Sequence, residues 1–250
     1  IGIDYYKTIK QSDRKSKYME IFEKLKNKNF IYPCFESPEE LALKRKILMK
    51  QGKPPIYDRS SLMLKKDQIR SLLSSGKNPH WRLKLNNETI KWNDMIHGDL
   101  NFNNLSVSDP IVFRSDEMPL FTITSVVDDA DMGVTHVFRG DDHITNTAAQ
   151  IKLFKVIDAK IPTFGHFPLM KSKSGKGLSK RTDSFSIREC RKNKISPIVI
   201  LNYLKKIGTN QPMEKFENFE ELVKKFDLNS YSRNSVFFEP EDIIRLNSKF

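Results

Sequence analysis

The stretch VTHVFRGDDHITNTAAQIKLFKVIDAKIPTFGHFPLM, residues 134–170, decides the fold of this chain. Its opening residues, VTHVF, are rich in β-branched and aromatic side chains and end at a polar turn, which predicts a strand. Apolar residues then recur at 148, 151, 154 and 157, a spacing typical of a helix of about fourteen residues. HFPLM (166–170) predicts another strand. The order strand, loop, helix, strand predicts an α/β fold with a parallel sheet.

Two polar loops follow these strands. The first is Arg139–His143, and the second is KSKSGKGLSKR (171–181), which holds four lysines and an arginine around two glycines. Ligands of parallel sheets bind beyond the carboxyl ends of the strands, so we expect both loops at the ligand edge. The second loop does not fit the G-x-x-x-x-G-K-[ST] pattern of a nucleotide-binding P-loop. It is either a solvated basic turn or a loop that holds phosphate.

The flanking sequence predicts further elements. LFTITSVV (120–127) has the composition of a strand. Ser37, Pro38 and Glu40 form a capping box at the start of a helix that Gly52 ends. Other expected elements are helices at 17–30 and 64–76, strands at 31–35 and 81–85, and helices beginning near Ser196-Pro197 and Asn218. Residues from about 40 to 115 therefore suggest a small mixed module, and the last part of the chain is expected to be helical.

The charge distribution points to a polyanionic partner. The chain of 250 residues carries 43 Lys and Arg against 31 Asp and Glu, a net charge of +12. Residues 171–206 alone hold eleven basic and two acidic side chains, which favours nucleic acid over a lysine-rich composition throughout. No apolar run is long enough to span a membrane, and the first residues do not resemble a signal peptide. Two distant cysteines, Cys34 and Cys190, are typical of a reducing cytoplasmic setting.

Several sequence blocks along the whole chain resemble those of a known protein family. The blocks FESPEELALKRK, HWRLKL, SVVDDADMGVTHVFRGDDHITNT, FGHFPLM and GLSKR occur in this order. From about Lys10 to Phe250 the chain resembles the bacterial-type glutamyl-tRNA synthetases, which are class I aminoacyl-tRNA synthetases. The resemblance implies a Rossmann-like catalytic domain (1–35 and 117–182), split by an inserted α+β acceptor-binding module (36–116). A helical stem-contact domain (183–250) would follow.

The resemblance also implies a reaction, the ATP-dependent ligation of glutamate to tRNA through a glutamyl-adenylate, with Mg²⁺ accompanying ATP. GLSKR resembles the family's second signature, in which a mobile lysine neutralises the departing pyrophosphate in the transition state. Lys180 matches that lysine, and Ser179 lies beside it as the second catalytic candidate. Gly177 stands where the signature usually begins with a lysine, and Lys176 lies one place earlier.

Binding residues carry over in the same way. The residues expected at ATP are Lys180, Asp142, His143, Met170, Gly177, Leu178 and Arg181. Arg139 matches the arginine that holds glutamate, because a carboxylate needs a fixed guanidinium. Its alternative role is a structural ion pair with Asp141 or Asp142. Phe121 and Ser125 are the other glutamate candidates, and they stand where the family often has a tyrosine and an asparagine.

Two family features have no counterpart in the sequence. Some members hold zinc through C-x-C and a later Cys/His pair, but here Cys34 is followed by Phe35-Glu36 and the later stretch reads YDRSSL. We therefore expect no zinc or other bound metal. The His-Ile-Gly-His-type signature and the anticodon-binding region also have no match. This piece is expected to be a central slice that does not activate glutamate alone.

Alternatives remain open at this point. The resemblance would also suit a glutaminyl-tRNA synthetase or a relative that attaches glutamate to a tRNA base. A non-catalytic RNA-binding remnant of a synthetase is a third possibility. The expected partners are glutamate and tRNA(Glu), with tRNA(Gln) as a second candidate. A cytoplasmic monomer without a membrane partner is expected.

Overall fold

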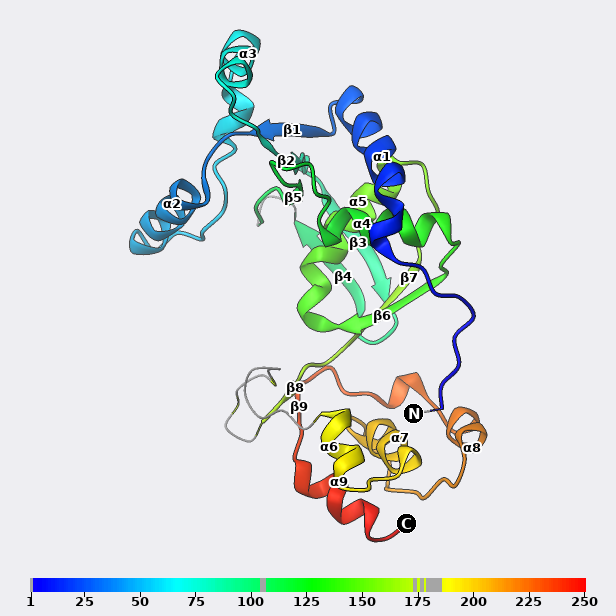
Figure 1. Cartoon of the computed structure of the whole chain (residues 1–250). Coiled ribbons are helices and arrows are strands. Elements are labelled where there is room, and N and C mark those ends of the chain that lie inside the picture. The colour runs from blue at the N-terminus through cyan, green and yellow to red at the C-terminus, as the bar shows by residue number, and fades with distance from the viewer. Residues whose placement is uncertain (1, 104–106, 173–174, 176–177, 179–185) are drawn as a thin grey trace.

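The computed structural model describes residues 2–103, 107–172, 175, 178 and 186–250. Figure 1 shows a larger α/β body and, below it, a smaller group of short helices from the C-terminal part of the chain. Within the described part of the chain, no helix has the length and apolar character needed to cross a membrane.

A four-stranded sheet in the order β4-β3-β7-β6 forms the centre of the larger body. β6 (His136–Gly140) and β7 (Thr163–Phe167) are parallel, and α5 (Ile144–Val156) connects them. This arrangement confirms the predicted strand–helix–strand unit and the α/β class. β3 (Thr89–Asp94) pairs in parallel with the other side of β7, where Asp94 is the register partner of Phe164. β4 (Gly98–Asn103) pairs with β3 as an antiparallel hairpin.

The predicted strand at 120–127 is wrong, because this segment forms the helix α4 (Phe121–Asp131). Ile123, Val126 and Val127 are spaced as on one helix face and are almost fully buried. Burial of that face against the main core outweighs the low helix propensity of β-branched residues, since propensity differences are small per residue. The β-branched composition therefore misled the sequence-based prediction.

A second sheet covers the top of this body. It holds β1 (Ile31–Cys34), β2 (His80–Leu83) and β5 (Ile111–Phe113) in the order β1-β2-β5. The helix α1 (Lys15–Asn27), which follows the short helix η1 (Gln11–Arg14), buries Phe22 in edge contacts with Trp81 and Phe113. The core of the body therefore includes residues from both sheets and from α1, α4 and α5.

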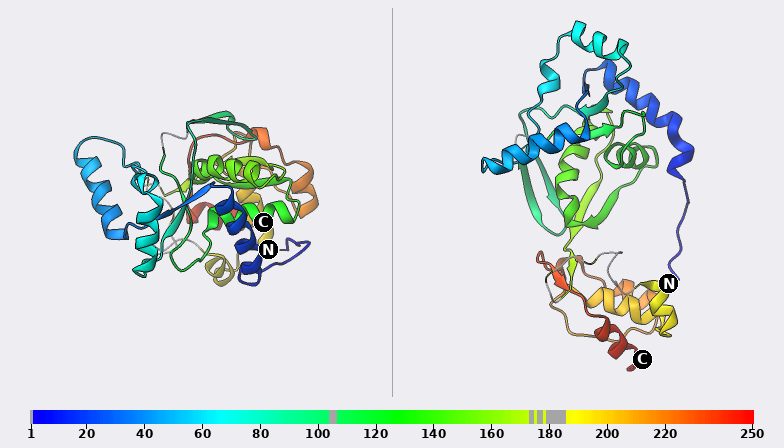
Figure 2. Two further views of the ribbon diagram at one scale, coloured as in Figure 1. Left: turned by 90° about the horizontal axis from the view of Figure 1, so that it is seen from above. Right: turned by 60° about the vertical axis from the view of Figure 1, so that its left-hand side comes forward.

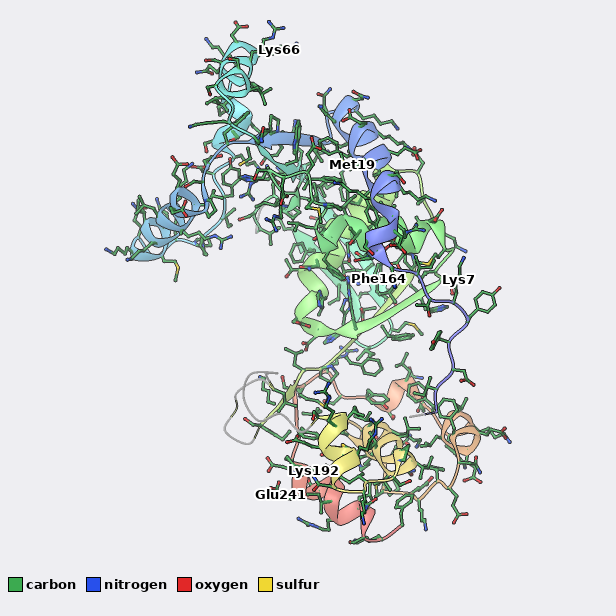
Figure 3. All side chains as sticks on the ribbon, in the orientation of Figure 1. Lys7, Met19, Lys66, Phe164, Lys192 and Glu241 are labelled. Carbon is green, nitrogen blue, oxygen red and sulfur yellow. The ribbon has the colours of Figure 1, made fainter. Side chains whose placement is uncertain are left out.

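Two helices project from the body into solvent (Figure 2). They are α2 (Pro38–Lys50) and α3 (Lys66–Ser74), with the short helix η2 (Ser60–Met63) between them, and neither α2 nor α3 contains a buried residue. The predicted capping box is confirmed, since the Ser37 side chain accepts from the Glu40 amide and the Glu40 carboxylate accepts from the Ser37 amide. In Figure 3, Lys66 lies on the outermost helix, whereas Phe164 lies inside the body.

The predicted strand at 166–170 is divided between two sheets. β7 ends at Phe167, and β8 (Met170–Lys171) instead pairs in parallel with β9 (Val236–Phe237). Pro168 lies between them and has no backbone N–H to donate to a strand ladder. The β8–β9 pair thus connects the larger body to the C-terminal helices: α6 (Ile187–Lys192), α7 (Pro197–Lys206), α8 (Phe219–Lys224), η5 (Leu228–Ser230) and α9 (Pro240–Asn247).

Candidate active site

Arg139 lies near the carboxyl end of β6, and groups from two neighbouring elements hold its guanidinium. Its Nη2 donates to Oγ1 of Thr147 and to Oε1 of Gln150, both at 2.5 Å. Its Nε donates to Nε2 of His166 at 3.3 Å. Arg139 and His166 are register partners across the β6–β7 pair, and Thr147 and Gln150 lie one turn apart on α5. The strand–helix–strand unit therefore fixes the orientation of the cation.

His166 is fixed in turn by Asp94. Its Nδ1 lies 2.5 Å from Oδ2 of Asp94, and both side chains are almost fully buried. The other oxygen of Asp94 accepts from the backbone amides of Ile96 and His97 at 3.0 Å and from that of His166 at 3.2 Å. Burial alone would raise the pKa of Asp94, but these hydrogen bonds, with that from His166 first, hold it well below its ordinary value. Asp94 is therefore an ionised carboxylate inside the core.

The charge of Arg139 is only loosely balanced by the protein. Burial lowers its pKa, and the negative charges of Asp129, Asp142 and Asp94 oppose that shift. Burial also raises the pKa of Asp129, against the opposing effect of Arg139. Among the residues that the structure describes, none forms an ion pair with Arg139, so the alternative role in an ion pair with Asp141 or Asp142 is not observed. A half-buried guanidinium of this kind is suited to an anionic ligand.

The other two glutamate candidates lie near Arg139. Ser125 on α4 accepts a hydrogen bond at 2.5 Å from the Gln150 amide, and its hydroxyl donates to the carbonyl of Phe121 at 2.7 Å. The Phe121 ring is half exposed and lies 5.4 Å from the ring of His143. The three predicted residues thus come together at one place, with Gln150 as the link between Arg139 and Ser125.

The ATP candidates are described only in part. Asp142 and His143 lie in the short helix η4 (Asp141–His143), which directly follows β6. Met170 is exposed in β8, and its carbonyl accepts from the amide of Leu178 at 3.5 Å, so these two candidates are in contact. Ser179, Lys180, Gly177 and Arg181 lie outside the described residues, and their roles remain predictions.

Sequence reasoning missed four polar residues of this site: Asp94, Thr147, Gln150 and His166. The sequence did indicate Thr147 and Gln150 as candidates. Both are polar and stand three positions apart, and so share one face of the helix that is predicted to follow Arg139. His166 lies within the block FGHFPLM, whose pattern predicts a strand and assigns no role to this side chain. Asp94 is 72 positions from His166, and no local pattern indicates that pairing.

A second polar cluster surrounds Glu36, in the part of the chain where some members of the resembled family hold zinc. The carboxylate of Glu36 accepts from the Cys34 thiol, the Tyr57 hydroxyl and the hydroxyls of Ser60 and Ser61, at 2.6 to 2.9 Å. Burial and the bond to Glu36 raise the pKa of the Cys34 thiol. In the part of the chain that the structure covers, no group of three His, Cys, Asp or Glu side chains could hold a metal ion.

Comparison with known proteins agrees with this geometry. Residues 1–244 match the family model described as tRNA synthetases class I (E and Q), catalytic domain. The chain is 41% identical over 250 residues to the glutamate–tRNA ligase of Azospirillum brasilense and 42% identical to glutamate–tRNA ligase 1 of Wolbachia sp. subsp. Brugia malayi. It spans 56% and 57% of those proteins, or little more than half of their length.

Solved structures show the same fold. The chain matches the glutamate–tRNA synthetase of Elizabethkingia anophelis with a TM-score of 0.84 at 23% identity, over 98% of this chain and 55% of that one. It matches a glutamate–tRNA ligase of Elizabethkingia meningosepticum, solved in complex with its amino acid, with a TM-score of 0.81 at 25% identity over 99% and 55%. The match of residues 1–244 to the family model shows that the chain belongs to the class I tRNA synthetases of the E and Q group, and the likeness to the solved structures shows the same fold.

Proposed function

We propose that the full-length protein ligates glutamate to tRNA, using ATP and passing through a glutamyl-adenylate. The observation that carries this proposal is the half-buried Arg139, a cation without an ion-pair partner among the described residues. The family match and the relatives named glutamate–tRNA ligase support it.

Each site residue has a proposed role. Arg139 binds a carboxylate of glutamate, and Phe121 and Ser125 contact the same ligand. Asp142, His143, Met170 and Leu178 contact ATP, together with Gly177 and Arg181. Lys180, supported by Ser179, neutralises the pyrophosphate as it departs, and Mg²⁺ accompanies ATP. No zinc is required, because the Glu36 cluster makes the contacts that would otherwise organise that part of the module.

The wider assignment follows the family pattern. The catalytic domain is proposed to comprise 1–35 and 117–182, with the acceptor-binding module at 36–116 and the stem-contact domain at 183–250. The substrate is tRNA(Glu), with tRNA(Gln) as a second candidate, and the protein works as a cytoplasmic monomer. The backbone pairs β3–β7 and β8–β9 tie these parts together, so a contact made in one part can influence the others.

The proposal is tested by tRNA charging with the full-length protein. Purified enzyme, ATP, Mg²⁺ and total tRNA are incubated with labelled glutamate or labelled glutamine, and acylated tRNA is counted. We expect incorporation of glutamate but not of glutamine, and a loss of about 10²-fold or more in rate for Lys180→Ala. Lys15→Ala, a change at an exposed residue of α1, is the control. Binding of tRNA without any charging would favour the RNA-binding remnant, and equal rates for Lys180→Ala would remove the role given to that loop.

A further inference from the structure

The chain itself uses three of the five N–H donors of Arg139. A guanidinium presents one N–H at Nε and two at each terminal nitrogen, and it has no acceptor. Nε donates to His166, and the two bonds of Nη2 go to Thr147 and Gln150. Among the described residues, Nη1 has no hydrogen-bond partner. The usual two-nitrogen edge of Nε and Nη2, which binds carboxylates side-on, is therefore already taken.

The neighbours of His166 decide which of its two ring nitrogens carries the hydrogen. Nε2 of His166 faces Nε–H of Arg139 at 3.3 Å and the Thr147 hydroxyl at 2.8 Å, and a lone pair on Nε2 can accept from both. The hydrogen of the neutral ring then lies on Nδ1, where Oδ2 of Asp94 accepts it at 2.5 Å. Asp94 cannot turn away, because three backbone amides hold its other oxygen. One tautomer of His166 thus satisfies Asp94, Arg139 and Thr147 together. The other would set a lone pair on Nδ1 against the Asp94 carboxylate and an N–H on Nε2 against Nε–H of Arg139, with only the Thr147 hydroxyl left to accept from Nε2.

We propose that His166, held in this tautomer by Asp94, is a positioning residue that orients Arg139 so that Nη1 alone receives the carboxylate of the amino-acid substrate. This inference rests on the proposed function, since it assumes that the ligand of Arg139 is glutamate. Asp94 stands at the end of β3 in the β3–β4 hairpin, so the hairpin takes part in setting the substrate contact on β6.

Burying Asp94 and His166 costs free energy, because both side chains lose their contacts with water. A buried carboxylate and a buried imidazole require strong hydrogen bonds to offset their loss of water. If these two positions served only to fill the core, apolar side chains could occupy them without that cost. The chain instead places an ionised carboxylate, a ring of fixed tautomer and a cation in series, an arrangement that transmits orientation from one group to the next.

The test uses Asp94→Asn in the full-length protein, with charging of tRNA as the assay. The asparagine oxygen still accepts from the three backbone amides, but its NH₂ group faces Nδ1 of His166 and selects the opposite tautomer. Nε2–H then opposes Nε–H of Arg139, and the Thr147 hydroxyl is the acceptor that remains for it among the contacts of this nitrogen. We expect the KM for glutamate to rise by about tenfold or more while the KM for ATP stays within about twofold. In ¹⁵N-histidine NMR spectra of the full-length protein, the protonated nitrogen of His166 changes from Nδ1 to Nε2.

A matched pair at His166 separates positioning from packing. His166→Gln offers a carbonyl oxygen in place of Nε2, whereas His166→Leu fills the space without an acceptor. We expect the glutamine variant to have a glutamate KM closer to that of the wild type than the leucine variant. His136→Ala, at the exposed start of β6, is the control for a histidine change in the same strand pair.

The outcomes distinguish this inference from the function on which it rests. A wild-type protein that charges no tRNA with glutamate would overturn the proposed function and this assignment with it. A wild-type protein that charges normally, together with an unchanged glutamate KM in Asp94→Asn, would overturn the positioning role alone. So would an NMR spectrum of the wild type with the hydrogen of His166 on Nε2.

Discussion

Nε of Arg14 donates to Oδ1 of Asp128 at 2.6 Å, although the two residues are 114 positions apart. The hydroxyl of Tyr18 and the amide of Gln11 also donate to this carboxylate, each at 2.9 Å. Asp128 is 6% exposed and belongs to α4, whereas its three partners belong to η1 and α1. This carboxylate therefore fastens the start of the chain to the helix that carries Ser125.

Loss of that carboxylate is expected to destabilise the whole body. In Asp128→Ala, Arg14 keeps only its contact with Asp131, and the buried Tyr18 hydroxyl loses its acceptor. The free energy of unfolding should fall by about 2–4 kcal/mol in urea titrations. Asp158→Asn is the control, because its side chain is 75% exposed, asparagine tolerates the positive φ of 59° at this position, and the ion pairs with lysine should contribute less than about 1 kcal/mol. Equal losses in both variants would contradict this role.

The Glu36 cluster predicts an acid-dependent loss of stability. Burial alone would raise the pKa of Glu36, but hydrogen bonds from Cys34, Ser60 and Ser61 hold it well below its ordinary value of 4.5. A carboxylate with a depressed folded-state pKa stabilises the fold fully above its unfolded value. That contribution is lost as the pH falls below 4.5 towards the folded-state pKa.

Glu36→Gln tests this contribution directly. At about pH 6 the variant should be less stable than the wild type by roughly 1–3 kcal/mol, because charge-assisted hydrogen bonds become neutral ones. The difference should shrink as unfolding is measured at lower pH, since the wild type then loses the same charge. Glu20→Gln, on the exposed side of α1, is the control and should follow the wild-type profile. A difference that stays constant with pH would rule out titration of Glu36 as its cause.

The fold could be predicted where local patterns were sufficient. The unit of β6, α5 and β7 follows from residues within one stretch of the chain, and the capping box before α2 spans four residues. α4 could not be predicted this way, because its β-branched residues are helical only through their burial against other elements. The division of the strand predicted at 166–170 was missed for a related reason, since β9, the partner of β8, lies far along the chain.

In the candidate site, too, some residues could be predicted from the sequence and others could not. The resemblance of sequence blocks led to Arg139, Phe121 and Ser125, which the structure brings together. The groups that orient Arg139 come from long-range pairs such as Asp94 with His166, and no periodicity or motif predicts them. The residues proposed to contact the ligand were thus easier to predict from the sequence than the residues that hold them in place.

The cluster around Glu36 also predicts indifference to zinc. Because the Glu36 carboxylate and five hydrogen-bond donors, Lys44 among them, already satisfy one another there, a zinc chelator should change neither the melting temperature nor the rate of charging in excess Mg²⁺. Elemental analysis of the purified full-length protein should find well below one zinc ion per chain. Stoichiometric zinc, or a melting temperature that falls on chelation, would refute this prediction.

The basic face of α6 predicts a salt-dependent contact with tRNA. Arg188, Arg191 and Lys192 are exposed, and among the described residues none of them has an ion-pair partner; Figure 3 shows Lys192 on the lower group of helices. If two of them neutralise phosphates, the double variant Arg191→Gln and Lys192→Gln should bind tRNA more weakly. The slope of log affinity against log salt should also fall by roughly 1.4–1.8, since each phosphate contact contributes about 0.7–0.9.

A matched pair of lysines gives the control for that measurement. Lys24 and Lys28 lie 3.9 and 3.6 Å from Asp158, so part of their charge is already balanced. Their double glutamine variant removes the same formal charge but should leave the slope close to that of the wild type. Equal changes in slope for the two double variants would mean that net charge, and not the face of α6, governs the binding of tRNA.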